Sequence, residues 1–298
     1  MSAGEIAVEV PRSARFPHEP AVYGPEEPDE VDAWFRAHGF VIVRGAFDDD
    51  LLLAMERECV AAQAAVVDGS VPDRHGTSIL IEGDAGEKRQ AFANYVTYVN
   101  ELSPAVLDAA THPLVRAAMQ RWLGPDAWLL DDVRFGVVYQ DARAGRESSY
   151  TRIGWHSDWQ SGPNLDMWPS VAFTFHLDGT SPANGFLRVV PGSHRWATPA
   201  PFQNVNGAVV PEGSAEAGGY TDAPPPVPMP LGFDKVPGEV AVYAERGDII
   251  FHDAYLWHSA ARATDDEATR RHVRGGWYSG AGKITGEHLD DFVKNAAR

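Results

Sequence analysis

Three histidines of the chain are followed two residues later by an aspartate, a spacing that can hold a metal ion. The pairs are His156/Asp158, His176/Asp178 and His288/Asp290, among 11 histidines in all. Two imidazoles and one carboxylate are the ligands of one class of mononuclear iron site, which leaves positions open for dioxygen and a cosubstrate. Three occurrences show that the spacing alone is not selective, so the surrounding sequence must decide between the pairs.

His156 and Asp158 lie in "IGWHSDWQSG", where an extended backbone would project both side chains from one face. His288 and Asp290 lie in "GEHLDDFVKNAAR", which is typical of a helix, where residues two apart point in different directions. We therefore expect a solvated surface for the second pair and a metal site for the first.

His176 ends the strand-like run "SVAFTFHLD". Strand alternation places His176 on one face with Ala172 and Thr174, opposite the apolar face of Val171 and Phe173. That face could line a cavity, or His176 could be a hydrogen-bonded interior histidine.

A third metal ligand has to come from further along the chain. The segment "RGDIIFHDAYLWHSAARATDDEATRR" offers His252 and His258, each after a strand-like run, and it ends in Arg270 and Arg271. A guanidinium binds a carboxylate in a bidentate manner, so an arginine here suits a dicarboxylate cosubstrate.

Helices are expected to precede these residues. Residues 1–28 are rich in Pro and Glu without periodicity and predict a surface arm. "DEVDAWFRAHG" predicts a helix ending at Gly39, "FVIVRG" a strand, and "LLLAMERECVAAQAAVV" a helix capped by the acidic residues 48–50. "SPAVLDAATHPLVRAAMQRWLG" predicts two helices broken before Pro113, so residues 29–125 form a helical N-terminal part.

Short strands rich in Val, Phe, Tyr and Trp alternate with turns over residues 126–280 and predict an antiparallel β core. Residues 197–238 are too long and too rich in Pro and Gly for a simple connection and predict a lid-like insertion. We expect residues 1–298 to form a single domain.

Composition excludes several classes of protein. The net charge of −17 argues against nucleic-acid and anionic-membrane partners, and no apolar run is long enough for a membrane span or a secretion signal. The single cysteine, Cys59, excludes an internal disulfide and a multi-cysteine metal site. These features indicate a cytoplasmic protein.

The motifs together resemble the phytanoyl-CoA dioxygenase-like (PhyH) family of Fe(II)/2-oxoglutarate oxygenases. The similarity rests on "FRAHGFVIVRGAF", "WHSDW", "LDGTSPANGFLRVVPGSHR" and "GDIIFHDAYLWHS" in this order, followed by an arginine about a dozen residues on. It implies a mainly β fold with flanking helices, a double-stranded β-helix (jelly roll, cupin-like) buttressed by N-terminal helices.

The resemblance also implies roles for residues. His156, Asp158 and His258 match the iron ligands, which makes them the catalytic centre, and Arg270 matches the arginine that binds 2-oxoglutarate. The spacing from His258 to Arg270 is one residue longer than the family pattern, so Arg271 stays a rival, and only one of the two can face inward on a strand.

Weaker matches complete the expected pocket. Thr174 matches a position beside the cosubstrate, and Tyr139 or Gln140 could reach the same pocket from the preceding strand. Asn94, Tyr95 and Tyr98, after a polar loop, could face the substrate or simply pack. His252 is expected to support the site rather than bind the ion.

The expected activity is an Fe(II)- and 2-oxoglutarate-dependent dioxygenase that uses O2 to hydroxylate or otherwise oxidise a small molecule, with natural-product biosynthesis as its setting. The alternatives are a non-catalytic jelly-roll binding protein and a cupin-type metal-dependent isomerase. The expected state is a monomer or homodimer.

Overall fold

The computed structural model describes residues 20–76, 93–132, 135–143, 153–161, 169–199, 217–230, 232–265 and 267–279. Residues 1–19 of the expected N-terminal arm, residues 200–216 of the expected insertion, and the pair His288/Asp290 lie outside these ranges.

The first two helices begin and end where the sequence indicates. Helix α1 (Pro28–His38) ends at Gly39, whose left-handed conformation (φ 80°) is one that glycine adopts without strain. Helix α2 (Asp49–Asp68) begins after Asp48, whose carboxylate accepts a hydrogen bond from the Leu51 backbone N–H at 2.8 Å. Helices α3 (Pro104–Ala110) and α4 (Pro113–Leu123) are separated before Pro113, as predicted.

Twelve strands of the described chain form two sheets. The larger has the order β1-β2-β10-β7-β12-β5-β3, with β4 beside β12, and the smaller has the order β6-β11-β8-β9. The strands are β1 (Val22–Tyr23), β2 (Phe40–Val43), β3 (Tyr95–Val96), β4 (Trp128–Leu129), β5 (Val138–Arg143), β6 (Ile153–His156), β7 (Ser170–His176), β8 (Leu187–Val189), β9 (Val240–Val242), β10 (Ile249–Asp253), β11 (His258–Ala260) and β12 (Thr269–Tyr278).

One boundary of the expected surface arm is wrong. Val22 and Tyr23 form β1, which pairs in parallel with β2 at the edge of the large sheet. Tyr23 is buried and lies against Trp34 of α1, with 6.1 Å between the ring centroids. The polar, proline-rich surroundings hid a two-residue strand, because so short a strand is stabilised by its neighbours rather than by its own sequence.

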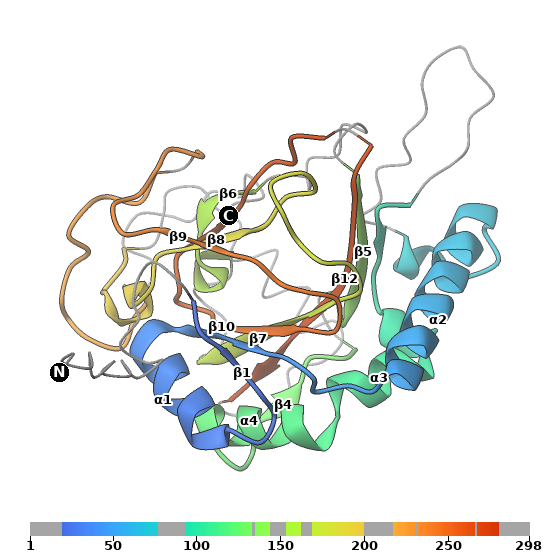
Figure 1. Ribbon diagram of the computed structural model, residues 1–298, viewed down its shortest axis with the longest axis horizontal. Helices are drawn as coiled ribbons and strands as arrows, with labels where there is room; N and C mark the ends of the chain where they lie inside the picture. The colour runs from blue at the N-terminus through green and yellow to red at the C-terminus, as the bar shows by residue number, and fades with distance from the viewer. Residues whose placement is uncertain are drawn as a thin grey trace, which may run out of the picture.

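The two sheets face each other as a jelly roll, and the helices cover one of them. In Figure 1 the helices line the lower and right sides of the large sheet, while β6, β8 and β9 lie on its other side. The large sheet therefore has a face toward the helices and a face toward the small sheet. We call these the helix face and the inner face.

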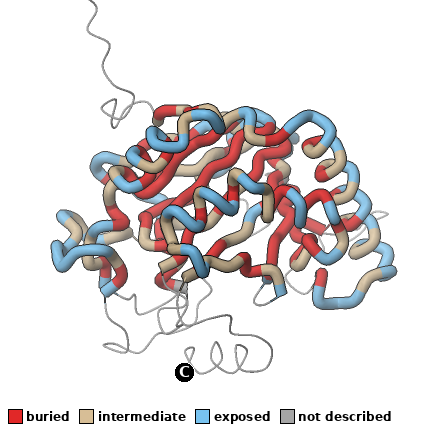
Figure 2. The backbone as a smooth tube through the Cα atoms, turned by 90° about the horizontal axis from the view of Figure 1, so that it is seen from below, coloured by how far each residue is buried: buried red, intermediate tan, exposed pale blue. Residues whose placement is uncertain are grey.

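Alternation along the strands assigns each residue to a face. On β7, Phe173 and Phe175 are fully buried on the helix face, and such burial contributes about 1.5–3 kcal/mol per side chain. Trp277 of β12 shares this face, and its indole N–H donates to the Ala110 carbonyl of α3 at 3.3 Å. Buried backbone is concentrated in these central strands, as Figure 2 shows.

A glycine makes room for this packing. Gly275 of β12 lies opposite Phe173, and a Cβ at this position would approach the Phe173 ring to 2.5 Å. None of the helices in the described ranges combines the length and the hydropathy that a membrane span requires.

Candidate metal centre

Two histidines from distant parts of the chain meet on the small sheet. His156 is the last residue of β6 and His258 the first of β11, and the two are directly paired in the antiparallel register. Their ring centroids are 4.1 Å apart. Directly paired residues project from the same face of a sheet, so both imidazoles lie on the side of the large sheet.

Backbone carbonyls orient both rings. Nδ1 of His156 lies 2.9 Å from the Gly154 carbonyl oxygen, and Nδ1 of His258 lies 2.9 Å from that of Leu256. A carbonyl can only accept, so each Nδ1 carries the proton and donates it. Each Nε2 therefore keeps its lone pair for a metal ion.

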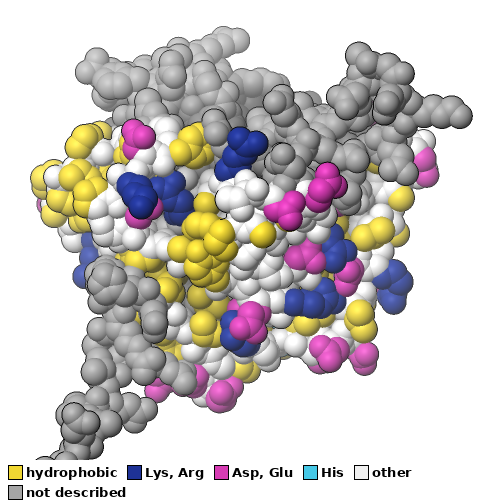
Figure 3. Space-filling view, turned by 45° about the horizontal axis from the view of Figure 1, so that its top comes forward, with side chains coloured by type: hydrophobic (Ala, Val, Ile, Leu, Met, Phe, Trp, Pro, Cys, Tyr) yellow, Lys and Arg dark blue, Asp and Glu magenta, His cyan; other side chains and the backbone are white. Residues whose placement is uncertain are grey.

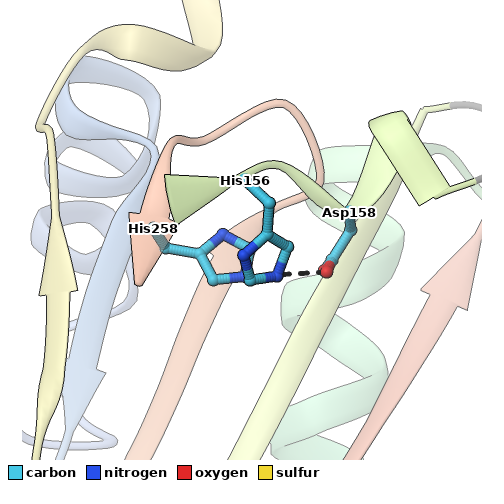
Figure 4. Close-up of side chains that lie close together, drawn as sticks. All are labelled: His156, Asp158 and His258. Carbon is cyan, nitrogen blue, oxygen red and sulfur yellow. Dashed lines mark ion pairs between the residues drawn. The ribbon is translucent and has the colours of Figure 1, made fainter. Parts of the chain in front are cut away.

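Asp158 joins the two histidines from a turn. It begins a 3-10 turn (Asp158–Ser161), so the expected extended backbone ends at His156. The Ser157 N–H donates to the Gln160 side chain within this turn at 3.1 Å. The Asp158 carboxylate lies 3.6 Å from Nε2 of His258, as Figure 4 illustrates for these three side chains.

The three residues offer one ligand atom each, and these atoms lie within 4.8 Å of one another. Among the described residues, this is the one group of three or more His, Cys, Asp or Glu side chains whose possible ligand atoms lie this close together. The donor set of two imidazoles and one carboxylate fits iron, because it occupies one side of an ion and leaves the other side open.

Burial and charge give the three ligands their metal-binding protonation states. Burial lowers the pKa of both His156 and His258, most strongly for His258, so the rings stay neutral. Burial would raise the pKa of Asp158, but the hydrogen bond from His252 and the neighbouring histidines hold it below its ordinary value. The carboxylate is therefore ionised.

His252 contacts the carboxylate. It is the fourth residue of β10, and its Nε2 lies 3.2 Å from Oδ2 of Asp158. The other oxygen of Asp158 faces His258. This geometry places His252 behind the carboxylate, where it orients Asp158 for an ion.

The described end of the insertion packs beside this centre. The Tyr220 hydroxyl donates to Oδ2 of Asp253 at 2.8 Å, and the Tyr255 N–H donates to Oδ1 at 2.8 Å. Burial raises the pKa of Asp253 to about 7. Tyr220 thus connects the insertion to the end of β10, next to His252.

Arg270 and Arg271 face opposite sides of the large sheet. Arg271 lies on the helix face, where it forms ion pairs with Asp178 and with Glu56 of α2, both at 2.7 Å. Arg270 lies on the inner face, is 6 % exposed, and its Nε has no hydrogen-bond partner. Burial lowers the pKa of Arg270.

Two further histidines accompany Arg270 on the inner face. His176 of β7 and His272 of β12 are directly paired, with 5.9 Å between their ring centroids. Both ring nitrogens of His176 and Nδ1 of His272 are buried without a hydrogen-bond partner. This favours the expectation that the face of His176 lines a cavity over that of a hydrogen-bonded interior histidine. Burial and the charge of Arg270 lower the pKa of His176 to about 3.

Strand pairing also separates the weaker candidates. Gln140 of β5 pairs with His272 and lies on the inner face, as does Thr174, which is opposite Arg274. Tyr139 lies on the helix face opposite Val273 and is fully buried, so it cannot reach a pocket between the sheets. Tyr95 of β3 pairs with Gln140 and also lies on the inner face.

His272 is a pocket residue that was not expected from the sequence. The signal was present, because His272 is two residues from Arg270 and alternation puts both on one face of a strand. His272 belongs to no recognisable motif, so nothing in the sequence suggested using this alternation to place it in the pocket.

Residues 35–272 match a family model described as phytanoyl-CoA dioxygenase (PhyH). No match to a curated protein was found.

Solved structures share the fold at low sequence identity. The epimerase SnoN in complex with Fe3+, alpha ketoglutarate and nogalamycin RO is 17% identical with a TM-score of 0.58, over 89% of this chain and 98% of that one. EctD from S. alaskensis with 2-oxoglutarate and 5-hydroxyectoine is 15% identical with a TM-score of 0.58, over 91% and 86%. AviO1 from Streptomyces viridochromogenes Tue57 is 16% identical with a TM-score of 0.56, over 87% and 98%.

Proposed function

The chain belongs to the phytanoyl-CoA dioxygenase (PhyH) family, and we propose from this membership that His156, Asp158 and His258 hold the iron of an Fe(II)- and 2-oxoglutarate-dependent dioxygenase. The observation that carries the proposal is the convergence of two Nε2 atoms and one carboxylate oxygen, with both Nδ1 atoms already engaged by backbone carbonyls. Bound iron, with 2-oxoglutarate and O2, supplies the oxidation that converts a substrate C–H bond to an alcohol.

Arg270 binds the distal carboxylate of 2-oxoglutarate in this proposal. Its support is a buried guanidinium on the inner face whose Nε has no partner in the protein. Leaving a buried donor unpaired costs about 1–3 kcal/mol, and a bound carboxylate would recover this cost. His176 and His272 add neutral imidazole N–H donors beside the same carboxylate.

Hydrogen bonds within the protein orient the three ligands before the ion binds. His252 holds the Asp158 carboxylate in place, and the two carbonyls fix the imidazole tautomers. The Asp158 side chain is 37% exposed, whereas His156 and His258 are buried, so solvent reaches the centre from the carboxylate. Arg271 takes no part, since its guanidinium is engaged by Asp178 and Glu56.

The substrate in this proposal is a small molecule of natural-product metabolism, oxidised by hydroxylation. The support is that two similar structures contain small molecules, SnoN in complex with nogalamycin RO and EctD with 5-hydroxyectoine. Both likenesses lie below one-fifth identity, so they support the size class of the ligand and not its structure.

The direct test is binding of the cofactors under anaerobic conditions. Addition of Fe(II) and then 2-oxoglutarate should produce a weak visible charge-transfer band, because the cosubstrate chelates the metal. His258→Ala should abolish the band. His194→Gln is the matched control, because His194 is equally buried but lies against the Arg36 carbonyl, away from the centre.

Other outcomes separate the alternatives. Iron binding without any response to 2-oxoglutarate would favour a cupin-type isomerase, and failure to bind Fe(II) would favour a non-catalytic jelly-roll protein. Succinate release with candidate small molecules then establishes turnover.

A further inference from the structure

A third arginine on β12, Arg274, shares the inner face with Arg270 but not its surroundings. It pairs with Thr174 of β7 and Val138 of β5, so its side chain projects toward the small sheet. Arg270 is buried, whereas Arg274 is exposed. The inner face is therefore closed around Arg270 and open to solvent at Arg274.

Arg274 lies two residues from His272 on the same face of β12. Burial lowers the pKa of His272, and the charges of Arg270 and Arg274 act in the same direction. Arg274 therefore faces the same space between the sheets as His272 and Gln140 of β5.

The guanidinium of Arg274 is held by a ring and not by a carboxylate. Its central carbon lies 5.4 Å from the ring centroid of Tyr95, a cation–π contact. In the described part of the chain no ion pair involves Arg274, whereas Arg44, Arg188 and Arg271 each bind an acidic side chain. Arg274 therefore keeps its hydrogen-bonding capacity for a ligand.

The overall charge of the protein opposes the binding of an anion. The chain carries a net charge of −17, and Figure 3 shows acidic and basic side chains mixed on the face drawn there. An anionic small molecule is repelled by the overall field, so its binding requires a local positive group. Among the pocket-facing strand positions, Arg274 supplies that group at the solvent-open end.

We propose that Arg274, supported by Tyr95, recognises an anionic group of the primary substrate, a carboxylate, phosphate or sulfate, and so restricts the enzyme to anionic small molecules. The inference rests on the proposed function, because it assigns Arg270 to the cosubstrate and leaves Arg274 for the substrate. A planar guanidinium donates two parallel N–H bonds to any of the three anions, which is the chemistry that they share.

The test uses the full chain loaded anaerobically with Fe(II) and saturating 2-oxoglutarate. Binding of benzoate, phenyl phosphate and phenyl sulfate is compared with that of the neutral benzamide and benzyl alcohol, by ligand-observed NMR titration. Wild type should prefer at least one anionic probe over the neutral probes by tenfold or more. The probe with the highest affinity identifies the anion class.

Two variants at this position and one elsewhere complete the experiment. Arg274→Gln should abolish the preference for anions while leaving the affinity for 2-oxoglutarate within about threefold of wild type, and Arg274→Lys should restore part of it. Arg116→Gln is the matched control, since Arg116 also lies over an aromatic ring, that of Trp277 at 5.3 Å, but on helix α4.

Three results would overturn the inference. They are equal binding of neutral and anionic probes, no binding of any anionic probe by wild type at millimolar concentration, and loss of 2-oxoglutarate affinity in Arg274→Gln comparable to that in Arg270→Gln. The last result would assign Arg274 to the cosubstrate. Failure of the proposed function would look different, because wild type would then not form the iron and 2-oxoglutarate complex at all.

Discussion

The two faces of the large sheet differ in how their buried arginines and histidines are paired. On the helix face, Arg271 is bound by two carboxylates, and its pKa is raised chiefly by the hydrogen bond to Asp178. On the inner face, the neighbouring Arg270 and the histidine pair His176 and His272 bury polar atoms without partners. The helix face also buries the Tyr139 hydroxyl without a partner, but the unpaired guanidinium and the two imidazoles lie together on the inner face. Because buried unpaired donors destabilise a fold, this cluster marks the place where a polar ligand binds.

The comparison is tested most strongly by the two adjacent arginines. Arg270→Gln should weaken 2-oxoglutarate binding by roughly 30- to 1000-fold, because the distal carboxylate loses its buried charged partner. Arg271→Gln should leave the affinity within about threefold and lower the stability instead. Anaerobic titration of the visible band measures both. If Arg271→Gln is the variant that loses the cosubstrate, the assignment of the two faces is reversed.

A second prediction concerns a polar pair that serves the fold. Asp248 is fully buried and receives two hydrogen bonds from the guanidinium of Arg44, at 2.8 and 2.9 Å, which join β2 to the start of β10. Arg44→Leu should lower the free energy of unfolding by about 3 kcal/mol, because it leaves the buried carboxylate without its cation and with the Glu245 N–H as its remaining donor. Urea denaturation measures the loss.

The double variant Arg44→Leu/Asp248→Leu should recover much of that stability, because replacement of a buried ion pair by apolar groups is often near neutral. Binding of 2-oxoglutarate should be unchanged in both variants at temperatures where they are folded. A single variant as stable as wild type would contradict a structural role for the pair.

A third prediction follows from the low pKa of His176, about 3 in the folded protein. The folded state keeps this ring neutral, whereas the unfolded chain takes up a proton below its ordinary pKa of about 6.5. Stability is therefore lost as the pH falls from about 6.5 toward 3. His176→Gln should reduce this loss by about 2 kcal/mol between pH 6.5 and 4.5.

Denaturation curves of the metal-free protein at several pH values give this difference directly. His75→Gln is a control, because His75 is also buried but its ring bonds the Thr97 carbonyl and faces Glu101. Equal pH dependence of wild type and His176→Gln would show that the ring is solvated or paired in solution.

The smallest expected effect concerns His252, which contacts the metal centre from the large sheet. His252→Gln should weaken Fe(II) binding by roughly 10- to 100-fold, as is usual when a residue that orients a ligand is removed. Anaerobic Fe(II) titration monitored by tryptophan fluorescence measures this change. Complete loss of iron, as expected for His258→Ala, would instead make His252 a ligand.

Local features of the sequence determined the elements and the kinds of chemistry available. The N-cap at Asp48, the glycine stop at Gly39 and the alternation along β7 depend on interactions within a few residues, so they could be predicted without the fold. The motif around His156 and Asp158 and its resemblance to the PhyH family likewise came from local spacing.

Tertiary structure alone decided which side chains share a space. The pairing of His258 with His156 joins residues about a hundred positions apart, and nothing local determines such a register. The choice between Arg270 and Arg271 depends on which face of β12 meets helix α2, and the missing partners of His176 appear only when both sheets are in place. Packing determines these outcomes, because it alone sets which buried polar groups are paired and which await a ligand.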